Sequence, residues 1–584
     1  MTPRTPATAP RGTIHPGAIA WTVALTTLTL WPLVFPGDLM LRDMVVPAHP
    51  ALTDAALGVG GAPARATPQD AVLALVGQVT SAARVASLLL FAAFVAGGTC
   101  AAEMARRLLS AGPVGQIAAV TMVLWNPFVV ERLLQGQWSL VIGAVLLPAI
   151  AVTGALGARW WRATALAAAG ITPTGAVLGL VVAAVSARTW RDRGVATLTG
   201  VVASAPWLAV TAAVALSGSG GAAGVASDPA GAQAFAARAE HLVGTIGALA
   251  GLGGIWNGQA VPDSRNHGLA ALAVVMLLAL FAVGARRAWA PGMRLPDGST
   301  PAAIGVRRRL IVLAAAAVIV PALAATPPGL AAMEWLIAHV PGAGLLRDGQ
   351  KWVALALPGY AVLAASGATA LAALLPRPRR WLAGATAALM IMVAVPDLPT
   401  AVAPLRPVPA WPGWQPVSGL VAMTDQAVAV LPAGTYRTIA GRPVLDPATK
   451  ILPADVLHTG DLAVGGRLVE GESPRASRVQ EALLTAPDDA VATLRAEGVG
   501  WVLVENSPGE FGESARVLEH LDRVYADAGI MLFHVPGAVT RTPQPDRAPA
   551  WAGLAAWALL LVAGPAAGAA RGAGAALSAS RRRR

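Results

Sequence analysis

The sequence predicts an all-α polytopic membrane domain of about 12 membrane segments, then an extracytoplasmic α/β domain and a final anchoring transmembrane helix. Three observations carry this prediction. Hydrophobic residues make up 55% of the 584 residues and charged residues only 13%, about half the share in soluble proteins. Many apolar runs reach the roughly 20 residues that a spanning helix needs. Residues 398–547 differ, since they carry more charge and mix strand and helix patterns.

The predicted spanning segments are separated mostly by short loops rich in arginine. They lie near residues 17–36, 84–102, 113–130, 137–158, 194–217, 268–285, 309–326, 352–374, 380–396 and 549–569. The first is interpreted as a helix that is retained, because it lacks the small-residue cleavage site of a signal peptide. We therefore assign residues 1–397 to a multi-pass membrane domain, and residues 548–584 to a terminal helix with a basic cytoplasmic tail.

The apolar run from residue 163 to 187 is predicted to form two half-helices. It lies between two arginine-containing segments, WWR and RTWRDR, that are both typical of the cytoplasmic boundary. A single span would place them on opposite sides of the membrane. We therefore predict a break at residues 171–175, where Ile-Thr-Pro-Thr-Gly interrupts the run. Non-helical backbone at this depth is tolerated where protein or a wet cavity surrounds it.

The distribution of basic residues orients the chain. With the amino terminus in the cytoplasm, more than half of the 43 Lys and Arg residues fall in cytoplasmic loops or in the terminal RRRR tail. This asymmetry is the positive-inside pattern of a plasma-membrane protein. It places both termini in the cytoplasm and residues 398–547 outside. It also accounts for the net charge of +12 without a nucleic-acid partner.

Residues 398–547 combine strand and helix patterns. Apolar runs at 427–432, 499–505 and 530–536 are predicted to be strands. Amphipathic segments at 486–498 and 513–522 are predicted to be helices. Strands that alternate with helices indicate a small α/β domain.

Residue types and spacings exclude several kinds of site. Cys100 is the only cysteine, so the chain forms no internal disulfide and no cysteine-based metal cluster. The histidines lack the helical spacing of a zinc site, and the sequence contains no phosphate-binding loop, dinucleotide fingerprint or Ser-His-Asp signature. Chemistry on the outer face would therefore need a donor already carried across the membrane, such as a lipid-linked one.

The first outer loop presents acidic residues close to the membrane exit. It begins FPGDLMLRDMVVP, which contains Asp38, Arg42 and Asp43. A carboxylate at this place can act as a general base on an acceptor hydroxyl group or bind a divalent metal, and both interpretations stay open. An ordinary solvated polar loop is the simpler alternative.

A second outer segment, WNPFVVERLLQGQWSL at residues 125–140, contains a dense set of polar residues. Asn126 and Pro127 are predicted to end one helix, and Glu131 and Arg132 to occupy a very short outer turn. Gln137 is predicted to begin the next helix. The segment either packs against a site or contains a Glu–Arg pair that closes a tight hairpin.

A third segment, PGAGLLRDGQKW at residues 341–352, contains Arg347, Asp348 and Lys351. Arg347 and Lys351 are four residues apart, so on a helical turn they would share one face. Two cations at the outer rim suit an anionic head group, although cations also extend from helix ends toward the interface.

A fourth segment, GGIWNGQAVPDSRNHG at residues 253–268, combines aromatic and planar polar residues. Trp256 and Asn257 are candidate sugar contacts, because aromatic faces and planar polar groups often hold sugars. The alternative is a solvated loop.

Together these features resemble the GT-C superfamily, integral membrane glycosyltransferases that use polyprenyl-phosphate sugars. The resemblance rests on the many helices, the acidic start of the first outer loop, the NP…ER…GQW segment, the outer R-x-x-x-K and the outer α/β domain. It implies that a first-loop carboxylate is the catalytic base, or a metal ligand in some members. By position that residue is Asp43, with Asp38 as the alternative. The pair is separated here, in D-L-M-L-R-D, which weakens the metal-binding version.

The resemblance implies a bacterial cell-envelope enzyme that moves a sugar from a polyprenyl-phosphate donor to an extracytoplasmic glycan or lipid acceptor. The implied donor-phosphate ligands are Arg347, Lys351 and Arg132. The implied supporting residues are Glu131, Gln137 and Asp348.

Two other functions stay open at this point. A non-catalytic scaffold or polymer-export accessory protein of the same fold would use these charges only for packing. A transporter would explain the broken segment at residues 171–175, since discontinuous helices often form transport sites. However, the sequence shows no second broken segment and few ionisable residues at mid-membrane.

Overall fold

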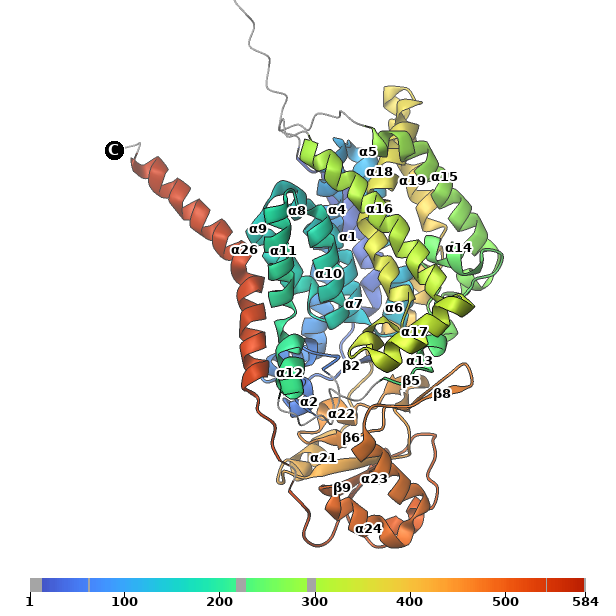
Figure 1. Cartoon of the computed structure of the whole chain (residues 1–584), viewed down its shortest axis with the longest axis vertical. Coiled ribbons are helices and arrows are strands. Elements are labelled where there is room, and N and C mark those ends of the chain that lie inside the picture. Colours follow the sequence, from blue (N-terminus) through green and yellow to red (C-terminus); the bar gives the residue numbers. More distant parts are fainter. Residues whose placement is uncertain (1–12, 61–63, 217–226, 291–300, 542, 582–584) are drawn as a thin grey trace, which may run out of the picture.

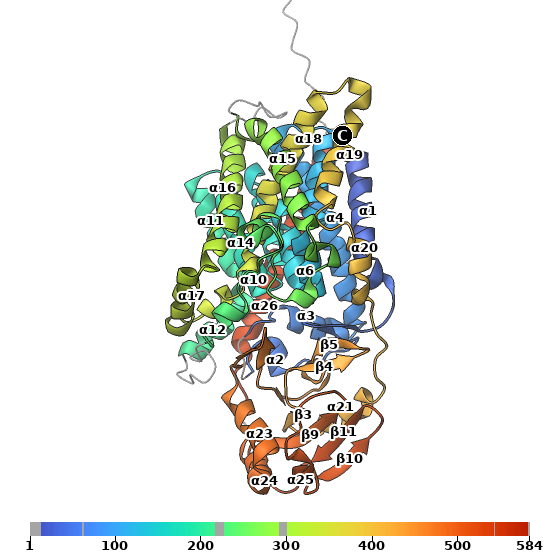
Figure 2. The same ribbon diagram turned by 90° about the vertical axis from the view of Figure 1, so that its right-hand side faces the viewer.

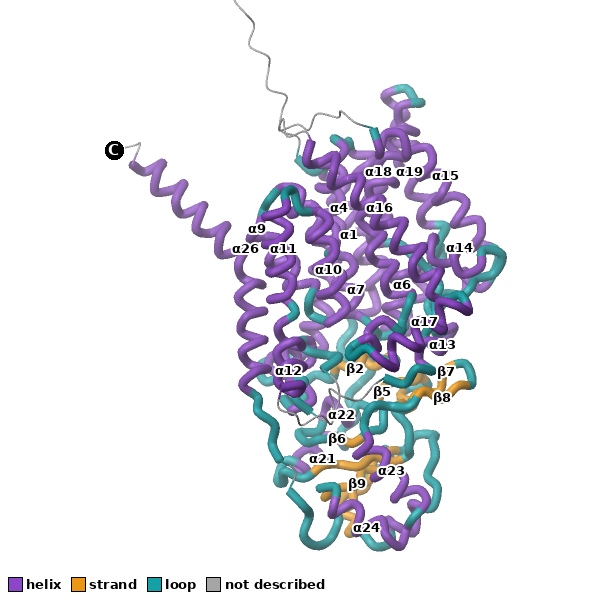
Figure 3. The backbone as a smooth tube through the Cα atoms, in the orientation of Figure 1, coloured by secondary structure: helices purple, strands orange, loops and turns teal. Residues whose placement is uncertain are grey.

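The computed structural model of the chain describes residues 13–60, 64–216, 227–290, 301–541 and 543–581. A body of helices occupies one end of the molecule, and residues of the predicted α/β domain occupy the other (Figure 1). Strands lie in that α/β part and in the layer that joins it to the helices (Figure 3). The last three residues of the RRRR tail lie outside the described residues.

The helices of the body alternate with short loops. They are α1 (Pro16–Leu30), α2 (Asp54–Leu57), α3 (Gln69–Gly77), α4 (Ala82–Leu109), α5 (Pro113–Leu124), α6 (Pro127–Leu134), α7 (Trp138–Val145), α8 (Leu147–Leu156), α9 (Arg159–Ala169), α10 (Pro173–Ser186), α11 (Trp190–Ala203), α12 (Ala205–Leu216), α13 (Gly231–Ala234), α14 (Gly244–Ala250), α15 (Leu269–Trp289), α16 (Pro301–Ala324), α17 (Pro327–His339), α18 (Leu357–Ala373), α19 (Arg380–Met392), α20 (Leu398–Ala401) and α26 (Ala548–Arg581).

Among the described residues, seven helices are long and apolar enough to cross a membrane, or up to nine if each of two bent helix pairs is one span. The bent pairs are α11–α12 and α16–α17, which turn by 68° and 88°. The predicted count of about 12 segments is not confirmed, because helices as short as α9, α10 and α19 do not reach across a bilayer alone. The prediction of a membrane protein with several spanning helices is confirmed without that exact count. The cytoplasmic placement of both termini stays a prediction.

The predicted break at residues 171–175 is confirmed. Helix α9 ends before Gly170, and α10 begins at Pro173. Proline suits this first helical position, because its fixed φ angle matches the helix and its missing N–H is not needed there. The two half-helices pack closely, since a Cβ atom on Gly175 would collide with the carbonyl oxygen of Ala169.

The prediction of a short outer turn at Glu131 and Arg132 is wrong. Asn126 begins a new helix instead of only ending α5: its Oδ1 accepts a hydrogen bond from the Val129 N–H at 3.0 Å. Its side-chain amide also donates to two carbonyls at the end of α5. Glu131 and Arg132 therefore lie fully buried within α6.

The helical body is held together by small residues and apolar side chains. Gly284 of α15 and Gly367 of α18 meet so closely that a Cβ atom on Gly284 would strike the backbone of Gly367. Such contacts are common between membrane helices, whose backbones approach where side chains are small. Helix α26 packs against α9 and α12, and the Trp557 indole donates to the Ala167 carbonyl at 2.8 Å.

The α/β part is built on a five-stranded sheet of order β10-β11-β9-β3-β6. Strand β3 pairs in parallel with β6 and β9, whereas β11 is antiparallel to both β9 and β10. The strands are β3 (Ala427–Leu431), β6 (Val456–Leu457), β9 (Val499–Glu505), β10 (Asp522–Ala526) and β11 (Ile530–His534). The three predicted strands are therefore confirmed. The exact limits of the domain, residues 398–547, stay a prediction.

Helices cover both faces of this sheet. One face packs against α23 (Pro474–Thr485) and α24 (Pro487–Ala496), and the other against α21 (Trp414–Val421). Strand β9 is buried throughout, which explains its unbroken apolar sequence. The remaining short helices are α22 (Ala448–Ile451) and α25 (Ser514–Leu518).

Three two-stranded hairpins lie outside the five-stranded sheet. They are β1–β2 (Leu39–Leu41 and Met44–Val46), β4–β5 (Tyr436–Ile439 and Arg442–Leu445) and β7–β8 (Leu462–Val464 and Arg467–Val469). The hairpin β4–β5 lies between the main sheet and the helical body (Figure 2). The Arg42 N–H donates to the Pro443 carbonyl at 2.7 Å, and the Leu445 N–H donates to the Arg42 carbonyl at 2.8 Å. The first outer loop is thereby bonded to the α/β part.

Candidate functional site

Asp43 lies at the turn of hairpin β1–β2, where the helical body meets the α/β part. Its Oδ1 accepts a hydrogen bond from the Tyr436 hydroxyl group at 2.6 Å. Its Oδ2 accepts from the side-chain amides of Gln135 and Gln137, each at 3.2 Å. The carboxylate is thus oriented by three donors from two distant segments, and the residue keeps partial exposure to solvent.

The backbone around Asp43 is fixed by the turn that follows α6. The Asp43 N–H donates to the Gln135 carbonyl at 3.1 Å. Gly136 has φ +87°, and a side chain there would collide with the backbone of hairpin β1–β2. Arg42, also in a left-handed conformation at φ +48°, donates to the Leu134 carbonyl at 2.5 Å and to the Gln259 carbonyl at 2.7 Å. Through these contacts the first loop packs closely against the end of α6.

Arg132 is the centre of the polar contacts inside the helical body. It donates to both oxygens of Asp348, at 2.5 and 2.8 Å, a bidentate geometry that fixes both groups. It also donates to the side-chain oxygens of Gln350 and, at 2.7 Å, Gln137. Every N–H group of the guanidinium therefore has an acceptor.

Gln137 connects Arg132 to Asp43. Its side-chain oxygen accepts from Arg132, so its amide nitrogen must face the other way, toward Asp43. The order Asp348–Arg132–Gln137–Asp43 is called the relay below. Burial raises the pKa of Asp348, but the charge and hydrogen bonds of Arg132 outweigh burial and hold that pKa below its ordinary value. Asp348 is therefore an ionised partner for Arg132.

Glu131 points away from the relay into a second buried cluster. Its Oε2 accepts from the Ile255 N–H at 3.1 Å and from the Gln350 amide at 3.3 Å. Among the described residues, its Oε1 has no hydrogen-bond partner. The buried ion pair of Glu240 and Arg265 lies beside it. Gln350 therefore connects Glu131 to Arg132 through hydrogen bonds of its side chain.

Arg347 and Lys351 do not share a helical turn, so that prediction is wrong. One 3-10 helix (Ala343–Leu346) ends before Arg347, and the next (Gln350–Ala356) begins after it. The Arg347 guanidinium lies 4.7 Å from the centre of the Phe235 ring, and the Lys351 Nζ lies 5.4 Å from a Trp352 ring. Within the described part of the chain, neither cation has a carboxylate within ion-pair distance.

The charges around Arg347 favour an incoming anion. Burial and, to a smaller extent, the positive charge of Arg65 lower the pKa of Arg347 to about 10, while Glu472 and two aspartates oppose the change. Positive charge is therefore costly here, and a bound anion would relieve that cost.

The candidate sugar contacts, Trp256 and Asn257, lie close to Arg347 and to the partners of Asp43, respectively. Trp256 packs edge-on against Phe235, with 4.8 Å between the ring centres. The Arg347 guanidinium lies over the same Phe235 ring. The Asn257 amide donates to the Gln135 side-chain oxygen at 2.7 Å, and Gln135 also contacts Asp43.

Asp38 lies apart from the relay. Its Oδ1 accepts from the Ala48 N–H at 2.7 Å, and its backbone pairs with Val408. Burial raises the pKa of Asp38, against the hydrogen bond from Ala48 and the charge of His49. These contacts hold the first loop in shape. Asp43 and Asp38 thus have separate partners, and the described residues contain no group of three His, Cys, Asp or Glu side chains suited to a metal ion.

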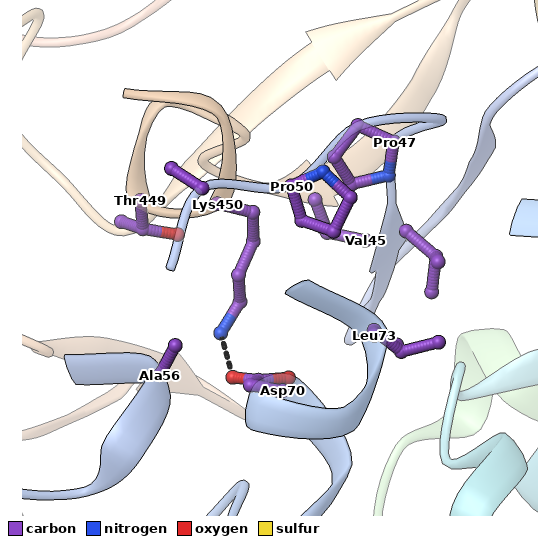
Figure 4. A pocket seen from close by; sticks show the side chains of 10 residues that line it. Val45, Pro47, Pro50, Ala56, Asp70, Leu73, Thr449 and Lys450 are labelled. Carbon is purple, nitrogen blue, oxygen red and sulfur yellow. Dashed lines mark hydrogen bonds and ion pairs between the residues drawn. The ribbon is translucent and has the colours of Figure 1, made fainter. Parts of the chain in front are cut away.

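The chain has two lysines, and the second, Lys450, connects the α/β part to the helical body. Lys450 of the α/β part forms an ion pair with Asp70 of α3, and both residues line a small pocket whose wall includes Val45 and Pro47 of the first loop (Figure 4). Asp43 does not line this pocket. The pair therefore stabilises the junction at a place beside the candidate site.

Sequence reasoning missed Tyr436, whose hydroxyl group contacts Asp43 from 393 positions away. Its surroundings show only a strand pattern. The one available signal is composition, since the chain has 3 tyrosines.

No protein-family model and no curated protein matches the chain. Among solved structures, it is similar to the arabinofuranosyltransferase AftD from Mycobacteria, with TM-score 0.55 and 17% identity over 89% of this chain and 39% of that chain. A mutant form of AftD gives TM-score 0.52 and 18% identity, over 89% of this chain and 41% of that chain. The chain therefore spans less than half the length of these proteins. At this low identity the similarity shows the fold alone, and at that level it agrees with the resemblance seen in the sequence.

Proposed function

We propose that this chain is a cell-envelope glycosyltransferase that moves a sugar from a polyprenyl-phosphate donor to a hydroxyl group of an extracytoplasmic glycan or lipid acceptor. One observation carries the proposal. A partly exposed carboxylate, Asp43, is oriented by the relay, and the relay ends at Asp348, which lies near two cations, Arg347 and Lys351, that form no ion pair among the described residues. Transfer from a phosphorylated donor needs both a base and a positive site for the phosphate.

In the proposed reaction, Asp43 removes the proton from the acceptor hydroxyl group as its oxygen attacks the anomeric carbon. The bond between that carbon and the phosphate oxygen breaks, and polyprenyl phosphate leaves with the electron pair. Arg347 and Lys351 stabilise the charge that develops on the phosphate. Attack opposite to the leaving group inverts the configuration at the anomeric carbon.

The contacts of Arg132 support a positioning role in place of a phosphate contact. Its N–H groups are already used by Asp348, Gln350 and Gln137, so binding phosphate would break a buried ion pair. Held as it is, Arg132 fixes the orientation of Gln137, which in turn donates to Asp43. Glu131 and Asp348 support this arrangement from either side.

Turnover by the purified protein in lipid tests the function directly. The first donor is a radiolabelled polyprenyl-phosphate arabinofuranose, because the similar structure AftD is named for that sugar. We expect labelled product and released polyprenyl phosphate in equal amounts. A folded protein that binds polyprenyl phosphate but transfers no sugar from any donor in a panel would support the scaffold function instead.

We expect Tyr436→Phe to lower kcat by about 10- to 100-fold with little change in KM for the donor, because a hydrogen bond to a charged group contributes about 1.5–3 kcal/mol. The substitution removes one of the three donors to Asp43 and keeps the ring. Steady-state kinetics measure the effect. Tyr525→Phe is the matched control, since Tyr525 donates to an exposed aspartate elsewhere in the α/β part. An unchanged kcat would contradict the role of Tyr436.

We expect Arg347→Gln and Lys351→Gln each to raise KM for the donor by about tenfold or more, since each removes a charge-assisted contact to phosphate. KM for the acceptor should change little. Arg516→Gln, on an exposed helix of the α/β part, serves as the control for loss of a positive charge. Equal effects on both substrates would argue against a phosphate site at these residues.

A further inference from the structure

A carboxylate of the α/β part lies among the cations of the helical body. The Oε1 of Glu472 accepts hydrogen bonds from the Arg65 guanidinium and, at 2.8 Å, from the Ser227 hydroxyl group. The Glu472 side chain is 8% exposed, whereas Arg65 is 53% exposed. An almost fully buried carboxylate of one part is therefore bound by two donors from the other.

These donors adjoin the proposed phosphate site. A Cβ atom on Gly344 would strike the Ser227 hydroxyl oxygen, so Ser227 packs against the short helix just before Arg347. The Arg347 side chain packs on Gly231, four residues after Ser227. Arg347 also lies within electrostatic range of both Arg65 and Glu472.

The local charges leave room for one further anion. Arg65, Arg347 and Lys351 contribute three positive charges against the negative charges of Glu472 and Asp228, while Asp348 is already paired with Arg132. Glu472 supplies a single negative charge and uses one of its oxygens for both bonds. A phosphate group has more acceptor oxygens than a carboxylate and can meet several donors at once.

Glu472 lies in a connection without regular secondary structure, between β8 and α23. The neighbouring Glu470 N–H donates to Asp228 at 2.9 Å, and the Gly471 N–H donates to Asp461 at 2.7 Å. The connection is thus anchored through its backbone on both sides of the junction. The Glu472 side chain can leave its donors without unpairing a strand or unwinding a helix.

We propose that Arg65 and Ser227 extend the site of Arg347 into a phosphate subsite, and that Glu472 occupies this subsite until a phosphate group replaces it. The identity of the phosphate as that of the lipid donor rests on the proposed function. Binding of phosphate itself does not require transfer. Replacement frees Glu472, so donor binding weakens one contact between the α/β part and the helical body.

Binding measurements on the full-length protein in lipid nanodiscs test this proposal. The probes are a short-chain polyprenyl phosphate and inorganic phosphate, measured by calorimetry without acceptor. We expect Glu472→Gln to tighten polyprenyl-phosphate binding by about tenfold, because it removes a competing anion, and Arg65→Gln to weaken it by a similar factor. Glu470→Gln is the matched control, since only the backbone N–H of Glu470 takes part in the contacts described above.

Whether Glu472→Gln tightens or weakens polyprenyl-phosphate binding distinguishes this proposal from a purely structural role of Glu472. If Glu472 only anchored the α/β part, its loss would leave binding unchanged or weaker, and either result overturns the proposal. Ser227→Ala provides an independent check, and we expect several-fold weaker binding; unchanged binding would remove Ser227 from the subsite. Tighter binding of inorganic phosphate alone would overturn the link to the lipid donor. Because no turnover is measured, these results stand even if transfer is never detected.

Discussion

Asp43→Asn is expected to lower the rate of sugar transfer by about three orders of magnitude while the protein still folds and inserts, because asparagine cannot accept the acceptor's proton. The substitution also disturbs the local hydrogen bonds. An amide nitrogen in place of Oδ2 would face the amide donors of Gln135 and Gln137. Gln137 cannot turn around, since Arg132 uses its oxygen. The asparagine therefore directs its oxygen toward the glutamines and its nitrogen toward Tyr436.

The matched control is Asp38→Asn, which changes the same functional group five positions earlier in the same loop. Asp38 bonds to Ala48 and not to the relay, so we expect a small loss of stability and near-normal kcat. Radiolabelled transfer and thermal unfolding are measured on both variants. Full activity of the Asp43→Asn variant would exclude Asp43 as the catalytic base. Loss of activity only in Asp38→Asn would move the role to that residue.

Most of the helical body could be predicted because apolar runs and proline positions are local signals. The break before Pro173 follows from the Ile-Thr-Pro-Thr-Gly sequence itself. The predicted turn after Asn126 is wrong for an equally local reason. Asn-Pro can end one helix or begin the next, and here Asn126 does both. Only packing of the buried Arg132 against Asp348 and Gln350 decides that a helix continues.

The candidate site could be predicted only in part. Charged residues in an apolar context are costly, so Asp43, Arg132 and Asp348 stand out in the sequence. Their partners do not, because the contacts join residues far apart along the chain, as between Arg132 and Gln350, which are 218 positions apart. Tyr436 and Glu472 lie in segments whose local pattern shows only strand or loop. Their roles depend on how the α/β part docks on the helices.

Arg132→Gln is expected to be among the most destabilising substitutions in this molecule. It leaves the ionised Asp348 carboxylate buried without its counter-charge, which typically costs about 3–5 kcal/mol. Glutamine is too short to bond Asp348 and Gln137 together, so the relay is broken as well. Thermal unfolding in detergent measures the loss. Arg516→Gln, which removes an exposed arginine, is the control and should unfold like the wild type.

The double variant Arg132→Gln/Asp348→Asn distinguishes stability from catalysis. With both charges removed, neither member of this ion pair stays buried without its counter-charge, so we expect most of the lost stability to return. Transfer should stay low, because Gln137 no longer has the donor that turns its amide toward Asp43. A stable but inactive double variant would show that Arg132 acts on the reaction through orientation of Asp43. Recovery of both properties together would mean that Arg132 serves the fold alone.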